Sequence, residues 1–338
     1  MSEEIIYTDS SEVTALIFGV VDAHVREIEN VFGVDIRNRS AGDGDAIIVS
    51  GPSDENVQKA AEVLSRLSAE AGDHEEISEQ RVAYIIGMVK DGQGAELAGL
   101  DDSVICLTSR GKPVKAKTVG QQQYVKSIAD NTVVLGVGPA GTGKTFLAVA
   151  MAVKALRAKS VSRIILTRPA IEAGEKLGFL PGDLQSKIDP YLRPLYDALF
   201  EMMGTENYAK LVEKQVIEIA PLAYMRGRTL DDCFIILDEA QNATPEQMKM
   251  FLTRLGNNAK AVVTGDLTQT DLPSGQKSGL ASAVKILSGI PDIKIHYFTE
   301  RDVVRHKLVQ KIIQAYDRYE REQQKPRPQK TRSERTNK

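Results

Sequence analysis

The feature that most constrains this chain is a glycine-rich loop between a short apolar strand and an alanine-rich helix. The strand is expected at 133–137, Val-Val-Leu-Gly-Val, and the helix begins near Lys144. Between them, residues 138–145 read Gly-Pro-Ala-Gly-Thr-Gly-Lys-Thr. This segment fits the phosphate-binding pattern G-x-x-x-x-G-K-[ST] in the strand–loop–helix context that the pattern requires. We therefore expect an α/β protein built around a phosphate-binding loop (P-loop).

The residue types in this loop suit a triphosphate. Glycines let the backbone wrap around phosphates without Cβ clashes, so that N–H groups and the helix N-terminus face the anion. Lys144 brings a positive charge to the β- and γ-phosphates, and Thr145 offers a hydroxyl to Mg²⁺. The alternative is a purely structural glycine turn. The predicted nucleotide contacts in the loop are Gly138, Pro139, Ala140, Gly141, Thr142, Gly143, Lys144 and Thr145.

Strand and helix patterns alternate through the region around this loop, about residues 116 to 318. The strand candidates are 133–137, 163–167, 216–219, 234–237, 260–264 and 294–298. Alternating strands and helices imply a parallel sheet covered by helices on both faces, as in a RecA-like P-loop NTPase. Functional side chains are then expected at the C-terminal ends of the strands.

Polar residues follow two of these strands. Asp238 and Glu239 come directly after the apolar strand 234–237. Asp238 is suited to hold Mg²⁺, directly or through water, and Glu239 is suited to orient and deprotonate an attacking water. After the strand at 260–264, Gln269 is a candidate γ-phosphate sensor, and Asp266 is a candidate for positioning the same loop. The acidic pair is weak evidence alone, but hydrolysis of a Mg²⁺–nucleotide complex needs both it and the P-loop.

A glutamine and a tyrosine upstream of the P-loop favour adenine as the base. The amide of Gln121 can pair with both the N6 donor and the N7 acceptor of adenine, and Tyr124 is a candidate for stacking on the base. No Asn-Lys-x-Asp pattern typical of guanine recognition is visible. The alternative is that these residues simply belong to the surface of a helix.

Residues 1–75 are expected to form a small α/β module. The expected elements are a strand at 14–18, a helix at 22–31, two strands at 35–39 and 46–50, and a helix at 55–67. This order resembles a KH-like RNA-binding domain. A KH domain clamps nucleotides with a G-x-x-G loop, whereas the segment 19–22 reads Gly-Val-Val-Asp and lacks the second glycine. The alternative is a protein-interaction or oligomerisation module.

A connector at 76–115 and a basic tail at 319–338 complete the expected organisation. The connector is predicted to contain a helix at 76–89, a loop at 92–102, a strand at 103–107 and a basic extended run from 110. That run is either a solvated linker or a strip for nucleic acid. The tail is basic and is expected to be disordered, with a role in salt-sensitive RNA affinity or in solubility.

Composition narrows the class of protein. The chain has 338 residues, a net charge of −3, and only two cysteines, which lie far apart in sequence. Nothing suggests a disulfide framework, a zinc site or a catalytic cysteine, and Cys233 is expected in the core. The acidic start is no signal peptide, and no apolar run is long enough to span a membrane. We expect a cytoplasmic protein.

Taken together, these motifs resemble the ATP-binding motor half of superfamily 1 helicases. The P-loop, the segment Asp-Glu-Ala-Gln at 238–241, the Gly-Asp-x-x-Gln loop and the upstream Gln121 carry this resemblance. More specifically, the chain resembles the PhoH family. Further residues that carry the family resemblance lie at 167–172, 174–182, 221–229, 272–275 and 302–306. The resemblance implies ATP binding and hydrolysis with Mg²⁺, and a role in RNA metabolism.

The arginines suggest two further hypotheses. Superfamily 1 helicases close the ATP site with arginines from a second motor domain, but this chain has room for one such domain. An arginine from the next subunit of a ring-forming homo-oligomer, such as a hexamer, is then expected to stabilise the γ-phosphoryl charge. The candidates are Arg228, Arg226 and Arg305, in that order; each has a structural salt bridge as its alternative. Arg168 lies where helicase motors contact single strands and is a candidate for an RNA phosphate contact.

The sequence thus predicts Mg²⁺-dependent ATP hydrolysis coupled to the binding or remodelling of single-stranded RNA. One alternative is an oligomeric scaffold that ATP switches, with slow turnover and no RNA stimulation. A second alternative is a kinase for a small molecule, which Glu239 beside Asp238 disfavours because this pair suits water as the acceptor.

Overall fold

The computed structural model describes residues 1–42, 44–71, 77–100, 103–169, 184–273 and 275–305, together with 308, 309, 312, 315, 316, 318 and 319; over 184–191 it describes the backbone. The chain forms two compact units, Met1–Val304 and Arg305–Lys338. The segment at 174–182 that contributes to the family resemblance lies outside the described residues, as does the predicted tail apart from residue 319.

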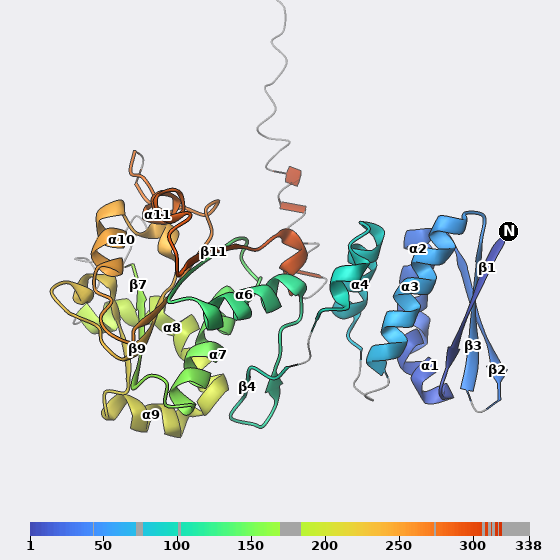
Figure 1. Cartoon of the computed structure of the whole chain (residues 1–338), viewed down its shortest axis with the longest axis horizontal. Coiled ribbons are helices and arrows are strands. Elements are labelled where there is room, and N and C mark those ends of the chain that lie inside the picture. Colours follow the sequence, from blue (N-terminus) through green and yellow to red (C-terminus); the bar gives the residue numbers. More distant parts are fainter. Residues whose placement is uncertain are drawn as a thin grey trace, which may run out of the picture. The chain divides into compact units, whose positions relative to one another are not determined.

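The N-terminal elements form the expected small α/β module (Figure 1). Its antiparallel sheet has the order β1-β3-β2, and the buried strand β3 is central. The predicted helices at 22–31 and 55–67 and the strands at 35–39 and 46–50 are confirmed. The elements are β1 (Ser2–Thr8), α1 (Ser11–Phe18), α2 (Ala23–Phe32), β2 (Asp35–Ala41), β3 (Gly44–Gly51) and α3 (Asp54–Ala71).

The strand predicted at 14–18 is wrong, because these residues belong to helix α1. Ser10 caps the helix, since its Oγ accepts a hydrogen bond from the Val13 N–H at 3.2 Å. The buried side chains Val13, Thr14 and Ile17 fall on one helical face, which a five-residue apolar run does not distinguish from a strand. Strand β1 was not predicted, because it is an edge strand and most of its residues are exposed or half-buried.

The predicted helix of the connector forms as α4 (Glu79–Lys90), and it shares the buried cluster of the N-terminal module. Its apolar side chains Val82, Ile85, Ile86 and Val89 face that cluster. The loop expected at 92–102 contains one helical turn, α5 (Gly94–Leu97). The strand expected at 103–107 is reduced to β4 (Cys106–Leu107), which pairs with β5 (Pro113–Val114) in the basic run. The domain boundaries at 75 and 115 stay predictions.

The P-loop domain contains a six-stranded parallel sheet with the order β11-β6-β10-β9-β7-β8. All six predicted strands are confirmed to within a residue or two. The strands are β6 (Val133–Val137), β7 (Arg163–Arg168), β8 (Ile217–Pro221), β9 (Cys233–Leu237), β10 (Lys260–Gly265) and β11 (Ile293–Tyr297). The helices are α6 (Val119–Asp130), α7 (Lys144–Arg157), α8 (Leu184–Met203), α9 (Thr205–Glu213), α10 (Pro245–Leu252) and α11 (Gly279–Leu287).

Alternate residues of each strand enter two different buried clusters, one on each face of the sheet. Val134, Ile236 and Val262 pack with apolar residues of α7 and α8. Their strand neighbours Leu135 and Ile235 pack with apolar residues of α10 and α11. Figure 1 shows these two pairs of helices on opposite sides of the strands. The predicted fold class, an α/β protein whose parallel sheet is covered on both faces, is confirmed.

The order of the strands brings four functional segments to one edge of the sheet. Strands β6, β10, β9 and β7 are neighbours and run parallel, so their C-terminal ends lie side by side. The P-loop follows β6, Asp266 follows β10, Asp238 follows β9, and Arg168 is the last residue of β7. Residues more than a hundred positions apart in sequence therefore meet at this edge.

The two cysteines, Cys106 and Cys233, are free and buried, so the expectation that Cys233 is a core residue is confirmed. Among the described residues, no helix combines the length and the apolar character that crossing a bilayer requires. In the second unit, the described positions from 308 to 319 have helical backbone.

A first prediction concerns Gly136 in the centre of β6. A Cβ there would lie 2.7 Å from Cε2 and 2.9 Å from Oη of Tyr124, whose ring is fully buried. We expect Gly136→Ala to lower the free energy of unfolding by about 1–3 kcal/mol, as overpacking does, measured by urea denaturation. The control is Tyr124→Phe, which removes a hydroxyl without a hydrogen-bond partner among the described residues and is expected to be neutral or stabilising. Wild-type stability of Gly136→Ala would contradict this account.

Candidate nucleotide-binding site

A pocket of about 480 Å³ opens at the C-terminal edge of the sheet. It is lined by P-loop residues, by Arg168, Asp238, Glu239 and Gln269, and by side chains of α8. The predicted phosphate-binding residues and the predicted acidic pair thus share one pocket, although they follow different strands.

Glycines allow the P-loop to adopt backbone conformations with positive φ angles. Gly143 has a φ of 80° and precedes α7, and Gly138 has a φ of 152°. A Cβ at Gly138 would lie 2.7 Å from the carbonyl oxygen of Phe298, so only glycine fits there. Lys144 Nζ donates to the carbonyl oxygens of Gly138 and Pro139, at 2.7 Å each, and thereby keeps its charge inside the loop.

Of the eight predicted loop residues, five line the pocket, and Gly138, Pro139 and Thr142 are not among its lining residues. Thr142 is fully buried, and its hydroxyl donates to the Pro139 carbonyl oxygen at 3.0 Å, so it supports the loop from behind. Five of the predicted residues line the pocket: Ala140, Gly141, Gly143, Lys144 and Thr145. Their arrangement suits the anion-binding role that the sequence predicts.

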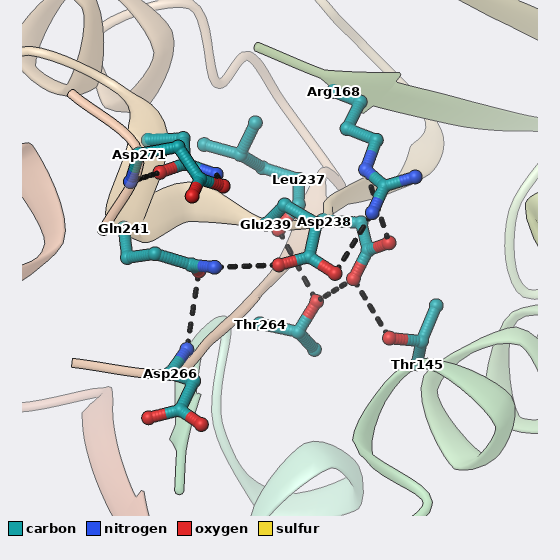
Figure 2. Close-up of polar contacts among 10 residues, drawn as sticks. Thr145, Arg168, Leu237, Asp238, Glu239, Gln241, Thr264, Asp266 and Asp271 are labelled. Atoms are coloured by element: carbon teal, nitrogen blue, oxygen red, sulfur yellow. Dashed lines mark hydrogen bonds and ion pairs between the residues drawn. The ribbon is translucent and has the colours of Figure 1, made fainter. Parts of the chain in front are cut away.

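Asp238 has polar contacts with residues from three other elements of the site (Figure 2). Its Oδ1 accepts hydrogen bonds from the hydroxyls of Thr145 and Thr264, both at 2.7 Å. Only 4% of Asp238 is exposed. The hydroxyl of Thr145 and the carboxylate of Asp238 are hard oxygen donors, which fit Mg²⁺. Among the described residues there is no group of three or more His, Cys, Asp or Glu that could hold a metal ion by itself.

Glu239 is held from two sides. Its Oε1 lies 2.8 Å from Nη2 of Arg168, and its Oε2 accepts a hydrogen bond from Nε2 of Gln241 at 2.5 Å. Its backbone has a φ of 52°, a left-handed conformation that is uncommon for a residue other than glycine. Local strain of this kind costs of order 1–3 kcal/mol and persists where the surroundings fix it. The contacts with Arg168 and Gln241 hold the side chain of Glu239 in place.

Three further residues with no role predicted from the sequence support the site: Gln241, Asn242 and Thr264. Gln241 is buried, and its Oε1 accepts from the Asp266 N–H at 3.1 Å, so it links Glu239 to the loop after β10 (Figure 2). The side-chain oxygen of Asn242 accepts from the Asp271 N–H at 2.8 Å and holds the same loop further along. The sequence feature that could have indicated Gln241 and Asn242 is their position between two alanines, directly after the acidic pair.

The loop after β10 matches its predicted roles in part. The Asp266 carboxylate accepts from the N–H of Thr268 at 2.9 Å and from its hydroxyl at 2.7 Å, which shapes the loop as expected. Gln269 is exposed and lines the pocket. Its role as a γ-phosphate sensor stays a prediction.

The predicted stacking of Tyr124 on adenine is wrong for this structure. The ring is fully buried and packs against His296 and Phe298, with ring centroids 5.5 Å and 5.0 Å apart. Burial also raises the pKa of its hydroxyl. Gln121 is 4% exposed; its Nε2 donates to the Thr142 carbonyl oxygen at 3.1 Å, and its Oε1 accepts from the Lys117 N–H at 2.7 Å. One end of this amide therefore supports the P-loop and the other end the segment before α6, and adenine recognition by Gln121 stays a prediction.

Asp302, from the last motif of the family resemblance, braces the start of α6 and the P-loop. Its Oδ1 accepts from the Thr118 hydroxyl at 2.7 Å, and a Cβ at Gly120 would lie 2.3 Å from the same oxygen. Two residues further on, the Val304 N–H donates to the carbonyl oxygen of Gly141 in the P-loop at 2.9 Å. This motif therefore holds the phosphate-binding loop from its outer side.

Arg226 and Arg228, two of the arginines proposed to act on a neighbouring subunit, are not among the residues that line the pocket. Arg228 forms two hydrogen bonds with Glu218, at 2.5 Å and 2.7 Å, and these raise the pKa of the guanidinium. Arg226 is exposed, and its side chain makes no hydrogen bond or ion pair with the residues that the structure describes. Arg305 begins the second unit. A role for any of them in a neighbouring subunit stays a prediction.

Arg168 lies inside the pocket, with 18% of its side chain exposed. Besides its contact with Glu239, its Nε lies 3.7 Å from Oδ2 of Asp238. In this arrangement the guanidinium faces the carboxylates of the nucleotide site. A contact between Arg168 and an RNA phosphate stays a prediction.

Comparison with known proteins identifies the family. Residues 113–317 match the family model described as PhoH-like protein. The chain belongs to the PhoH-like family. A PhoH-like protein of Mycobacterium tuberculosis is 53% identical over 305 residues, which cover 90% of this chain and 85% of that protein. A PhoH-like protein of Bacillus subtilis is 51% identical over 302 residues, covering 89% and 93%. These alignments are too long to be confined to the P-loop domain, so the likeness to other PhoH-like proteins extends into the N-terminal module.

One solved structure is a weaker match. The SWI2/SNF2 ATPase core of Sulfolobus solfataricus, in complex with double-stranded DNA, has a TM-score of 0.33 and 12% identity. The alignment covers 58% of this chain and 47% of that one. A likeness of this size carries no argument about this PhoH-like chain.

A second prediction tests whether Arg228 stabilises its own fold. The side chains of Arg228 and Glu218 are 30% and 34% exposed. Solvent therefore weakens this ion pair, but its two-point geometry strengthens it. We expect a coupling of about 1 kcal/mol in a double-mutant cycle of Arg228→Gln and Glu218→Gln, measured by urea denaturation. The exposed Arg226→Gln serves as the control and should change stability by less than about 0.5 kcal/mol. Strictly additive effects of Arg228→Gln and Glu218→Gln would show that the ion pair does not stabilise the fold.

Proposed function

We propose that this PhoH-like chain binds ATP and hydrolyses it with Mg²⁺. The observation that carries the proposal is that Glu239 stands beside Asp238 in the same pocket as the P-loop. A P-loop alone suits nucleotide binding. A carboxylate next to the residue suited to hold the metal suits the activation of water, and therefore hydrolysis.

Each residue has a role in this reaction. Lys144 and the loop N–H groups bind the phosphates, while Thr145 and Asp238 hold Mg²⁺, which neutralises charge on the phosphate oxygens. Glu239 accepts the proton of the attacking water. Gln269 senses the γ-phosphate. Gln241 fixes the Glu239 carboxylate through its 2.5 Å hydrogen bond and ties it to the loop that carries Gln269.

The proposal includes coupling to single-stranded RNA. Its support is the resemblance to helicase motors together with the KH-like order of the N-terminal module, strand–helix–helix–strand–strand–helix. The turn at 19–22 joins α1 to α2, and Val20 there is 80% exposed. A homo-oligomeric ring, in which an arginine completes the next subunit's site, and a cytoplasmic location belong to the same proposal.

The alternative is an oligomeric scaffold that ATP switches, with slow turnover. One observation favours it: both oxygens of Glu239 are engaged, one by Arg168 and the other by Gln241. A base held in this way is not available to water until Arg168 moves. This arrangement suits a protein whose hydrolysis step is slow in the absence of a stimulating partner.

A third prediction decides between the two functions through steady-state ATPase activity with and without single-stranded RNA. We expect RNA to raise the rate, Lys144→Ala to abolish ATP binding, and Glu239→Gln to lower kcat by ~10²–10⁴ while ATP still binds. A basal rate that RNA leaves unchanged would favour the scaffold. Full activity of Arg226→Ala and Arg228→Ala would contradict the proposal that these arginines complete a neighbouring site.

A fourth prediction concerns Gln241. In Gln241→Glu the donor to Glu239 becomes a second carboxylate, so the base is repelled and no longer held. We expect kcat to fall at least about tenfold, with the KM for ATP little changed, because the loss affects the orientation of the base rather than phosphate binding. The matched control is Gln247→Glu in α10, where the side chain accepts from the Thr244 N–H in a capping box that a glutamate also satisfies. Equal kcat values for the two variants would rule out this role.

A further inference from the structure

Arg168 contacts both carboxylates of the acidic pair: its Nη2 lies 2.8 Å from Oε1 of Glu239, and its Nε lies 3.7 Å from Oδ2 of Asp238. It comes from the last position of β7, and the Asp238 N–H donates to the carbonyl oxygen of the preceding residue, Thr167, at 2.9 Å. The parallel pairing of β7 with β9 therefore fixes the backbone of Arg168 next to Asp238. Neither the fold nor the phosphate-binding role of the P-loop requires an arginine at this position.

The contacts of Asp238 are divided between its two oxygens. Oδ1 faces the hydroxyls of Thr145 and Thr264, whereas Oδ2 faces the guanidinium of Arg168. Asp238 and Glu239 are adjacent carboxylates, and Asp238 is almost completely buried. Two such groups need a positive charge nearby, because an unpaired buried charge is strongly destabilising. Arg168 provides this charge from within the same chain.

We propose that Arg168 is an internal counter-ion of the acidic pair that competes with the metal for the carboxylate of Asp238, so that Mg²⁺ enters this site with the nucleotide and not before it. The identification of the metal and the nucleotide rests on the function proposed above. Arg168 is thus a positioning residue that holds both carboxylates by ion pairs until the nucleotide binds. It must leave Glu239 before that carboxylate can act on water.

Electrostatics supports an exchange of this kind. A guanidinium and a divalent cation that share one carboxylate repel each other strongly in a partly buried site, so the two compete. The nucleotide changes this balance because its phosphates are alternative partners for the guanidinium. Arginine binds phosphate oxygens in a two-point geometry. Arg168 lines the same pocket as the P-loop, so the guanidinium already faces the space in which those phosphates are expected.

The experiment measures metal binding without nucleotide, using Mn²⁺ as the probe because free Mn²⁺ is counted directly by its electron paramagnetic resonance signal. The variants are Arg168→Gln, which removes the charge, and Arg168→Lys, which keeps it. The matched control is Arg163→Gln, which removes an arginine from the other end of β7, where its side chain donates to the Asp231 carbonyl oxygen at 3.2 Å. Thermal unfolding of each variant establishes that it is folded.

We expect Arg168→Gln to bind Mn²⁺ at least about tenfold more tightly than the wild type, since it removes the competing charge. Arg168→Lys and Arg163→Gln should resemble the wild type, and adding Asp238→Asn to Arg168→Gln should abolish the gain. Equal affinity of the wild type and Arg168→Gln would overturn the proposal. So would a wild type that already binds Mn²⁺ as tightly without nucleotide as with ATP, a result that needs no variant.

The same measurement separates this inference from the proposed function. It involves no ATP hydrolysis, so a chain without ATPase activity can still show the competition between Arg168 and the metal. Conversely, an active ATPase in which Arg168→Gln leaves Mn²⁺ binding unchanged would keep the proposed function and remove the counter-ion role.

Discussion

The carboxylate of Asp238 is the interaction on which the organisation of the site depends. It follows β9 and accepts hydrogen bonds from Thr145 at the start of α7 and from Thr264 in β10, and it faces Arg168 at the end of β7. One buried side chain thus connects the P-loop helix with three neighbouring strands. The relative positions of these elements fix where the carboxylate of Asp238 stands in the pocket, so the arrangement of the pocket depends on the parallel register of the sheet.

Much of the fold could be predicted because the central strands are continuous apolar runs, buried on both faces. The segments around Val134, Ile236 and Val262 are of this kind, and each was predicted correctly. The N-terminal strand β1 and helix α1 were not, since an exposed edge strand carries no apolar run and a five-residue apolar run fits a helix or a strand equally well.

The site could be predicted only where a local motif carries its chemistry. The P-loop and the Asp238–Glu239 pair have such motifs, and both line the pocket. Tyr124 has the right chemistry for stacking but lies under β6, a fact that depends on how α6 packs on the sheet. The contacts of Arg168 with Glu239 and of Gln241 with Asp266 join residues that only the strand order brings together, so no local pattern indicates these two contacts.

The positions of the arginines constrain how the site can be completed. Arg228 and its partner Glu218 lie near the starts of β9 and β8, whereas the pocket lies at the end of β9. The five residues of β9 separate the two edges by roughly 17 Å at the usual rise of a parallel strand. Arg228 therefore cannot serve its own pocket, and serving a neighbour's would cost it the pair with Glu218. Arg168 needs no neighbour, because it already lies in its own chain's pocket; a subunit can thus control access of metal to Asp238 by itself, even if hydrolysis requires a ring.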